Sequence, residues 1–344
     1  MTTRTLASSR QRARGLLFLS LTLLLAACGG TAGPSPATAA SAAKPSASAA
    51  ATPVQIGYAQ VSNVHAPVFV AQEMGYFTQN GISADIKMAT GPAIAASITA
   101  GELQYGSIGG NEVIHGGLGG APLVGIATLA DAPVFSLYAD KKYKAVTDLE
   151  GQTIAVTSLG TATEATAMLI LKHYGMLGKV KISAAGGTNT GVIAGLLNHQ
   201  FAGAIVNPES AQQASDAGFV ELANAVKLGE PFNFDVLAVN RGYLKDHGDE
   251  VRRFLRAYQQ AWSYLGDPAN KASVIKMLQK YTKSDDRLAA IGYDGFYPVW
   301  ASQKVPTINP AAMASILAFS TEPGAKDAKP EQFIDNTFIQ SIQS

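Results

Sequence analysis

Three stretches of the chain place small hydroxyl, amide or carboxylate side chains next to glycine or proline where helices are expected to begin. They run from Ser107 to Asn111, from Ser158 to Thr161 and from Asn207 to Glu209. Unpaired backbone N–H groups and the helix dipole make such positions favourable for anions and other polar groups. We therefore expect a small-molecule site at these turns, with contacts from Gly109, Asn111, Ser158, Gly160, Thr161, Asn207 and Glu209.

The turn from Ser158 to Thr161 is the most specific of the three. Gly160 would let the backbone approach a ligand closely. Thr161 and Glu164 have the spacing of a capping box, in which each side chain bonds a backbone N–H group at the helix start. The turn could therefore be a helix cap with no ligand. Glu164 is expected to cap the helix rather than to contact a ligand.

Other candidates follow from their positions near the ends of expected strands. Tyr58 and Gln60 follow the first strand, and His65 lies before the first helix. His65 could donate to a ligand carboxylate or stack on a ring, although a loop histidine is often simply solvated. Asp235 and Glu209 could recognise an amine or a ring N–H group, or could serve as an inter-lobe hydrogen bond and a helix-terminal charge. The remaining candidates are Gly91 and Phe135, the latter as an apolar wall with Phe232 and Phe234.

The positions of the arginines limit the kind of ligand. No arginine occurs between Arg14 and Arg241. A planar bidentate clamp on a sulfonate or carboxylate therefore cannot come from the strand–helix turns in that range. The sequence favours a neutral, aromatic or heterocyclic ligand, or an anion held by N–H and hydroxyl groups.

Residue patterns for catalysis and metal binding are missing. The five histidines lack the spacing of a metal site. The chain has no Gly-x-Ser-x-Gly nucleophile turn, and Gly109-Gly110-Asn111 lacks the rest of the G-x-G-x-x-G phosphate-binding pattern. We therefore predict no catalytic residue, no metal and no cofactor, and we do not expect an enzyme.

The elements that must position the candidate residues alternate between strand and helix. Strand patterns separated by helix patterns occur at 54–58, 82–88, 105–108 and 123–129, and again at 153–157, 180–184 and 204–206. Such alternation predicts parallel sheets covered by helices. We therefore expect an α/β chain of two lobes with a cleft between them. Lobe I would comprise 54–140 plus 236–344, and lobe II would comprise 141–235.

The N-terminal segment has the pattern of an export signal. Four arginines, Arg4, Arg10, Arg12 and Arg14, precede the apolar run from Leu16 to Ala27. At about 1.5 Å per residue this run is too short for a bilayer core of about 30 Å. Residues 1–27 are therefore predicted to be a signal peptide. Setting the four arginines aside leaves 22 of the 26 basic residues against 25 acidic ones, so nucleic acid is not an expected partner.

Cys28 is the only cysteine of the chain, and it follows the small residues Ala26 and Ala27. The segment resembles a bacterial lipobox, in which the cysteine is acylated and becomes the mature N-terminus. The alternative is a chance cysteine at the end of the signal. Residues 28–53 are rich in Ala, Ser, Pro and Thr, and we expect a lipidated Cys28 followed by a disordered tether.

Several short motifs match a known family in the same order along the chain. They include Val54-Gln55-Ile56-Gly57-Tyr58, His65-Ala66-Pro67, Ala71 to Phe77, Asp148 to Ile154 and Asn207-Pro208-Glu209. These motifs resemble the nitrate/sulfonate/taurine class of ABC substrate-binding proteins, which also includes binders of thiamine-pyrimidine precursors. The resemblance implies a type II periplasmic-binding-protein fold whose cleft captures a small molecule. It also implies a monomer, lipid-anchored in the periplasm or on the outer face of the cytoplasmic membrane, that delivers its ligand to an ABC permease and ATPase.

Two other functions stay open beside solute capture for import. The fold class also resembles pyrimidine-precursor synthases, which use a lysine-bound pyridoxal phosphate and carry a cysteine cluster that this chain lacks. A sensor that passes its ligand state to a membrane kinase would use the same lobe closure. The sequence does not separate sensing from transport.

Overall fold

The computed structural model describes residues 51–320 and 322–342 of the chain. The predicted signal peptide, Cys28 and nearly all of the predicted tether lie outside these residues. The tether was expected to reach residue 53, but Thr52 and Pro53 already belong to the first strand, where they pair with Ile82 and Ser83. Proline is tolerated there because it lies near the start of the strand, before the neighbouring strand on its other side begins.

The first sheet has five strands in the order β2-β1-β3-β10-β4. Their bounds are β1 Thr52–Ala59, β2 Ile82–Ala89, β3 Tyr105–Gly109, β4 Leu123–Ala130 and β10 Asp235–Asn240. The strands β1, β2 and β3 are parallel, whereas β10 runs antiparallel to both β3 and β4. The sheet is therefore mixed, whereas the sequence predicted a parallel sheet. The strand β10 is antiparallel because the chain returns to the first sheet after it has formed the second one.

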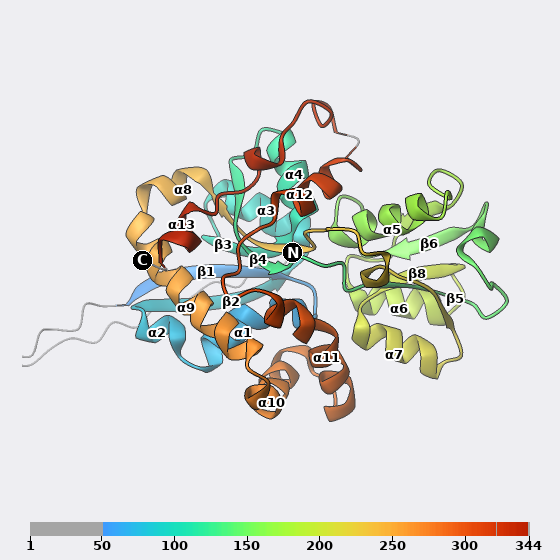
Figure 1. The fold of residues 1–344 in the computed structure, drawn as a ribbon, viewed down its shortest axis with the longest axis horizontal. Helices are drawn as coiled ribbons and strands as arrows, with labels where there is room; N and C mark the ends of the chain where they lie inside the picture. Colours follow the sequence, from blue (N-terminus) through green and yellow to red (C-terminus); the bar gives the residue numbers. More distant parts are fainter. Residues whose placement is uncertain (1–50, 321, 343–344) are drawn as a thin grey trace, which may run out of the picture. The chain divides into compact units, whose positions relative to one another are not determined.

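Helices cover both faces of the first sheet (Figure 1). The helices α3 Gly91–Ala100 and α4 Gly110–Leu118 lie on one face, and α1 Ala66–Glu73, α2 Tyr76–Gln79 and α9 Gly248–Gly266 lie on the other. A short 3₁₀ helix, η1 Asn63–His65, connects β1 to α1. The buried stripe of α9 recurs at helical spacing through Val251, Phe254, Tyr258 and Trp262, which packs this long helix on the core.

The second sheet also has five strands, in the order β7-β6-β8-β5-β9. Their bounds are β5 Ser136–Ala139, β6 Thr153–Val156, β7 Lys181–Ala184, β8 Gly203–Val206 and β9 Val220–Asn224. The helix α5 Ala162–His173 lies on one face, and α6 Asn189–Leu197 and α7 Pro208–Asp216 lie on the other (Figure 1). The predicted boundary at residue 140 placed β5 with the first lobe, but the structure places β5 in this second sheet.

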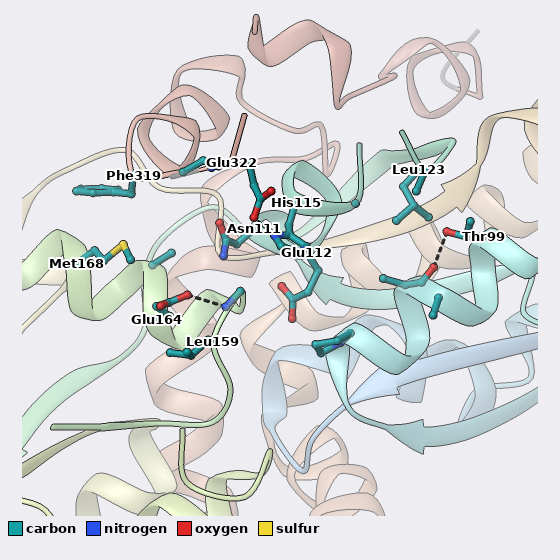
Figure 2. Close-up of a pocket in the computed structure, with 18 of the residues that line it drawn as sticks. Thr99, Asn111, Glu112, His115, Leu123, Leu159, Glu164, Met168, Phe319 and Glu322 are labelled. Atoms are coloured by element: carbon teal, nitrogen blue, oxygen red, sulfur yellow. Dashed lines mark hydrogen bonds and ion pairs between the residues drawn. The ribbon is translucent and has the colours of Figure 1, made fainter. Parts of the chain in front are cut away.

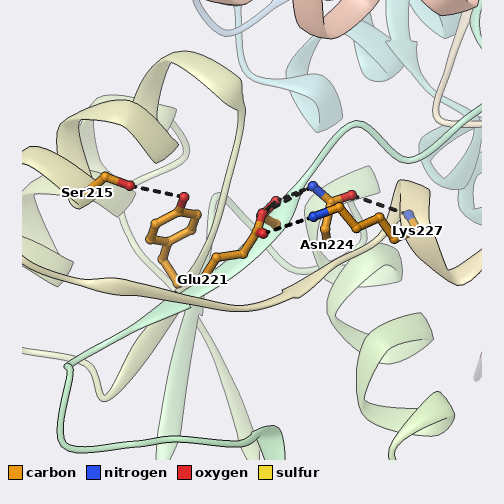
Figure 3. Close-up of polar contacts among 6 residues, drawn as sticks. Ser215, Glu221, Asn224 and Lys227 are labelled. Atoms are coloured by element: carbon orange, nitrogen blue, oxygen red, sulfur yellow. Dashed lines mark hydrogen bonds and ion pairs between the residues drawn. The ribbon is translucent and has the colours of Figure 1, made fainter.

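Backbone pairing and a polar cluster explain the position of β5. It runs antiparallel between β8 and β9. Ser136 of β5 donates to Glu221 of β9 at 2.7 Å, and Asn224 donates to both of these side chains at 3.1–3.2 Å. Ser215 of α7 donates to the hydroxyl group of Tyr138, also on β5, at 3.1 Å (Figure 3). These contacts lie within the second sheet and its own helix, so residues 136–139 cannot belong to the first sheet.

The remaining elements follow β10. They are α8 Arg241–Asp246, α10 Lys271–Thr282, α11 Asp286–Ser302, α12 Pro310–Leu317 and α13 Thr337–Ser341, with the short 3₁₀ helices η4 Pro268–Asn270 and η5 Pro330–Gln332. Two further 3₁₀ helices, η2 Val146–Leu149 and η3 Val226–Leu228, precede β10. The helix α11 crosses to the second sheet and packs on α7. Arg287 of α11 pairs with Asp216 of α7 at 3.1 Å. None of the helices in the described part of the chain is long and apolar enough to span a membrane.

Candidate functional site

A small cavity of about 20 Å³ lies between the two sheets, where strands of both end. Its walls come from the turns after β1, β3 and β6 and from the first residue of β10. Six of the predicted site residues line it: Gln60, Gly91, Gly109, Ser158, Thr161 and Asp235. We call this space the inner cavity. The structure therefore brings together residues that are up to 175 positions apart in the sequence.

Glu112 lines the inner cavity and was not among the predicted residues. It lies in the first turn of α4 and is only 5% exposed. Its two carboxylate oxygens occupy space left by two glycines. A Cβ atom on Gly91 would lie 2.1 Å from Oε1, and one on Gly109 would lie 2.2 Å from Oε2. Both predicted glycines thus make room for a buried carboxyl group. In the sequence, this group could have been found as the glutamate at the third position of the helix that follows Gly109.

Asp235 provides a second carboxyl group to the same cavity. It begins β10, lies opposite Gly109 in the strand register and is 2% exposed. Its Oδ2 and the Oε2 of Glu112 have no hydrogen-bond partner among the described residues. Burial raises the pKa of Glu112 to about 7. Burial, and then the neighbouring charge of Glu112, raise the pKa of Asp235 well above its usual range. Both carboxyl groups are therefore expected to be protonated to a large extent near neutral pH.

Hydroxyl groups form the wall from the second sheet. Thr157, Thr161 and Thr163 bond one another at 2.8–3.3 Å, and Thr161 Oγ1 also lies 2.7 Å from the carbonyl oxygen of Ser158. The predicted capping box of Thr161 and Glu164 does not form. Glu164 instead accepts from the backbone N–H of Gly160 at 2.6 Å, because Gly160 has a positive φ of 74° that turns this group toward the helix start. Glu164 thus serves the turn and not the inner cavity.

Gln60 lies at the end of β1 with a φ of 58°, a left-handed conformation that is uncommon outside glycine. Its Oε1 atom is buried and has no partner among the described residues. An unusual backbone angle at a residue that also presents an unpaired polar atom to a cavity is typical of a functional position. The structure thus places Gln60 at the inner cavity with an acceptor available.

His65 and Tyr58 do not line the inner cavity. His65 is fully buried, and both of its ring nitrogens have partners within the protein. Nε2–H donates to the carbonyl of Ala59, so Nδ1 accepts from the hydroxyl of Ser107 at 2.6 Å. Burial lowers the pKa of His65 to about 4. In this arrangement the neutral ring uses its one N–H within the turn, and contact of His65 with a ligand stays a prediction. Tyr58 packs edge-on against Phe69 at 5.1 Å.

Glu209 and Asn207 lie at the start of α7, outside the inner cavity. Asn207 accepts from the backbone N–H of Ser210 at 3.0 Å and so caps α7. Glu209 is 8% exposed and faces Asn63 and Gly292, where a Cβ atom would lie 2.5 Å from its Oε1 and 1.8 Å from Asn63 Nδ2. Burial raises the pKa of Glu209 to about 7, offset in part by the backbone N–H groups of Glu209 and Asn63. This second buried polar cluster joins α7, η1 and α11, and sequence reasoning missed Asn63.

Phe135 lies in the segment that connects the sheets and is buried. Its ring meets that of Phe234, in the returning connection, at 4.5 Å. Phe135, Phe232 and Phe234 do not line the inner cavity, and all three are buried in the core.

A larger groove of about 800 Å³ adjoins the inner cavity. It runs between α3, α4 and α5 and ends at Phe319, Ser320 and Glu322, with Met168, Leu159 and Phe319 among its apolar walls (Figure 2). Asn111 and Gly160, two further predicted residues, line this groove. Asn111 Nδ2 reaches the carbonyl of Thr161 at 3.4 Å. Glu112 lines both spaces and therefore marks where they meet. We call this space the outer groove.

Neither space is lined by a lysine or an arginine among the described residues. The arginines of the described part lie elsewhere; Arg253, for example, donates to Gly81 O at 2.8 Å and to Thr52 Oγ1 at 3.0 Å. No group of three or more metal-binding side chains occurs in the described residues. The site can therefore accept hydrogen bonds from a ligand at several points but offers no formal positive charge.

This chain has two α/β units, and polar residues gather where the strands of both units end. This arrangement is the fold of the periplasmic-binding-protein class. The ligand-binding component of an ABC-type import system from Staphylococcus aureus matches with a TM-score of 0.71 at 12% identity, over 85% of this chain and 99% of that chain. The periplasmic aliphatic sulphonate binding protein SsuA from Escherichia coli matches with a TM-score of 0.65 at 16% identity, over 82% of this chain and 92% of that chain. At these identities the likeness establishes the fold, which confirms the predicted fold class.

The chain belongs to the NMT1/THI5-like family, which matches residues 62–272. A yeast relative, the 4-amino-5-hydroxymethyl-2-methylpyrimidine phosphate synthase THI12 of Saccharomyces cerevisiae, is 27% identical over 67% of this chain and 70% of its own length. The formylaminopyrimidine-binding protein of Halalkalibacterium halodurans is 22% identical over 61% of this chain and 64% of its own length. The resemblance drawn from the short motifs is thus confirmed for family and fold, and the relatives that match this chain include one named as a synthase and one named as a binding protein.

Proposed function

We propose that this protein is an extracytoplasmic solute-binding lipoprotein that captures a small molecule between its two sheets and delivers it to an ABC importer. The observation that carries the proposal is the inner cavity. Its walls come from both sheets, and it holds buried polar atoms without partners, namely Glu112 Oε2, Asp235 Oδ2 and Gln60 Oε1. Unpaired buried polar groups destabilise a protein unless a ligand or water satisfies them.

Capture requires the two sheets to move apart, because about 20 Å³ is little more than the space of one water molecule. The connections through residues 131–135 and 225–234 would act as hinges between lobe I and lobe II. Lobe I would hold the first sheet and the C-terminal helices, and lobe II would hold residues 136–224 with the second sheet. Closing around the ligand would create the surface that the permease and its ATPase recognise.

The proposed place of work is the outer face of the cytoplasmic membrane or the periplasm. The pattern of residues 1–27 supports export, and Cys28 supports a lipid anchor. Residues 29–50 would hold the folded part, as a monomer, off the membrane. The import-system protein from Staphylococcus aureus that shares the fold supports an importer as the partner.

Synthase activity is the second candidate function, because the yeast relative carries a synthase name at 27% identity. The chain has one cysteine, and no lysine lines the inner cavity or the outer groove among the described residues. Incubation with pyridoxal phosphate is therefore expected to give no absorbance of a lysine Schiff base. A stable Schiff base would favour the synthase instead.

Thermal unfolding of the full chain against a panel of solutes tests the proposal. The panel would hold pyrimidines, amines, amidines, aromatic carboxylates, alkyl sulfonates and nitrate. A ligand at one hundred times its Kd adds about 2.7 kcal/mol of stability, and each kcal/mol corresponds to about 2–4 °C in a larger domain. We expect a selective shift of several degrees for one chemical class. No shift for any class would contradict solute capture.

A further inference from the structure

The inner cavity contains more free acceptors than free donors. The unpaired atoms are all oxygens: Glu112 Oε2, Asp235 Oδ2 and Gln60 Oε1. The threonine hydroxyl groups of the opposite wall already bond one another and the carbonyl of Ser158. No lysine or arginine lines the cavity among the described residues. A ligand that donates hydrogen bonds would satisfy these three atoms, and a cationic donor would also stabilise the ionised form of the two carboxyl groups, whose pKa values burial raises.

The two carboxyl groups are placed on either side of one glycine. Asp235 pairs with Gly109 in the β3–β10 register, and Glu112 Oε2 lies beside the same glycine. Any side chain at Gly109 would fill the space that the carboxyl groups share, since a Cβ atom there would also come within 2.9 Å of Ala162. The cavity thus presents two carboxyl oxygens from adjacent elements to a single ligand group.

Acidic side chains lie at the helix starts around the site. The helix α3 has no acidic residue in its own first turn, but Glu112 Oε1 lies beside its first residue, Gly91. Each of α4, α5 and α7 carries a glutamate in its first turn, respectively Glu112, Glu164 and Glu209. Glu164 accepts from Gly160 N–H at 2.6 Å, and the carboxyl groups of Glu112 and Glu209 lie buried at the other two helix starts. A negative charge in the first turn neutralises the positive end of the helix dipole. An additional anion would therefore meet acidic side chains instead of free N–H groups.

We propose that the inner cavity selects a nitrogen donor group, an amine or a planar amidine-type N–C–N edge, and that Glu112 and Asp235 bind its N–H groups together. This inference rests on the proposed solute-binding function and names the ligand class for the same site. The outer groove, which Glu112 also lines, would take the apolar remainder of the ligand along Leu159 and Met168. A carboxylate pair facing a planar nitrogen pair can form two parallel charge-assisted hydrogen bonds.

Four probes with the same ring and different polar groups test the inference on the full chain. Benzamidine and benzylamine supply the nitrogen donors, and benzoate and benzenesulfonate supply the anions. Titration calorimetry and thermal unfolding are expected to show binding of benzamidine or benzylamine and none of the two anions. The Glu112→Gln variant is expected to bind the nitrogen probes about tenfold more weakly or worse, because one charge-assisted bond is lost.

The matched control is Glu250→Gln, which changes another buried carboxyl group, one that accepts from Tyr105 at 3.0 Å and from Tyr243 at 2.6 Å and lines neither the inner cavity nor the outer groove. It is expected to leave the affinity unchanged. Circular dichroism and the melting temperature of unliganded Glu112→Gln check that the variant folds. If Glu250→Gln weakens binding as much as Glu112→Gln, the loss does not report a contact between Glu112 and the nitrogen group, and the inference is wrong.

Two other outcomes overturn the inference and differ in what they say of the proposed function. Binding of benzoate or benzenesulfonate in preference to the nitrogen probes would keep solute capture and reject a donor ligand. Failure of all four probes at millimolar concentration, while another solute of the wider panel binds, would again keep capture and reject the nitrogen class. Failure of every solute would reject both.

Discussion

Asp235 on β10 lies directly opposite Gly109 on β3, and this antiparallel pairing brings the aspartate beside Glu112, which bends back over the same glycine. The pairing exists because β10 returns to the first sheet after the chain has built the second one. A carboxyl group from residue 235 and another from residue 112 therefore share one buried cavity at the point where the sheets meet.

Stability of the unliganded protein is expected to fall as the pH rises from about 4.5 to above about 7. Burial raises the pKa values of Glu112 and Glu209 to about 7 and that of Asp235 well above its usual range. A carboxyl group with a raised pKa stabilises the folded state below its unfolded pKa, and that stability is lost as the pH rises through the folded pKa. Each glutamate contributes about 3 kcal/mol to this loss, at 1.36 kcal/mol per pKa unit.

His65 has the opposite effect on the pH dependence of stability. Burial lowers its pKa to about 4, so the stability that the neutral ring provides is lost as the pH falls below about 6.5. A comparison with Glu209→Gln isolates one carboxyl group from this background. Melting temperatures measured across the pH range should fall less steeply with rising pH in the variant than in the wild type. Parallel curves for the two proteins would show that Glu209 does not titrate with a raised pKa.

Gly292→Ala is expected to hinder closure of the sheets at the α11–α7 contact. The added methyl group would lie 1.8 Å from Asn63 Nδ2 and 2.5 Å from Glu209 Oε1, so these groups must shift. Overpacking of this kind costs about 1–3 kcal/mol. The variant should melt several degrees lower and bind its ligand more weakly. Gly119→Ala is the control, because a methyl group there has its nearest contacts at 3.4 Å. An equal loss of melting temperature and affinity in both variants would contradict a role of the α11–α7 contact in closure.

Gln60→Gly is expected to increase stability while weakening ligand binding. Gln60 has a φ of 58°, and a left-handed non-glycine residue costs about 1 kcal/mol or more. The same change removes the unpaired Oε1 acceptor from the inner cavity. Lys283→Gly is the matched control, because Lys283 has a φ of 56° at the end of α10 and does not line the cavity. Both variants should melt higher, and only Gln60→Gly should lose affinity, as measured by calorimetry.

Cys28→Ser is expected to release the protein from the membrane. Cys28 is the only cysteine of the chain, so radiolabelled palmitate should be incorporated in the wild type and not in the variant. Fractionation should move the variant to the soluble fraction with its ligand affinity unchanged. Labelling of the variant, or its retention in the membrane fraction, would contradict the lipid anchor.

The alternation of strands and helices predicted the fold well, because each strand carries an apolar run and each helix a clear start or stop. The position of β5 was not predictable from its own residues. Its pairing with β8 and β9 depends on contacts with residues such as Glu221 that follow it by 85 positions. The antiparallel direction of β10 was also not predictable from its own residues, because it depends on the direction in which the chain returns to the first sheet.

For the candidate site, glycine and hydroxyl positions at helix starts were predictable from local patterns, whereas burial was not. Gly91 and Gly109 were identified, but the carboxyl group of Glu112 that fills the space beside them was not. A glutamate in the first turn of a helix is usually an exposed cap, but Glu112 is buried among Gly91, Gly109 and the residues around Thr161 at the start of α5. Local patterns also did not predict the partners of His65. Both nitrogens of its ring form hydrogen bonds within the protein, with Ser107 and Ala59.

Calorimetric titration of the solute that gives the largest thermal shift, into the wild type and Gly109→Ala, tests capture in the inner cavity most directly. The added Cβ atom would lie 2.2 Å from Glu112 Oε2 and 3.2 Å from the backbone nitrogen of Ala162, so it fills the cavity. Thr99→Ala in the outer groove serves as the control. We expect one-to-one binding by the wild type and by Thr99→Ala, and loss of binding in a folded Gly109→Ala variant. Equal binding by all three proteins would show that the ligand lies elsewhere.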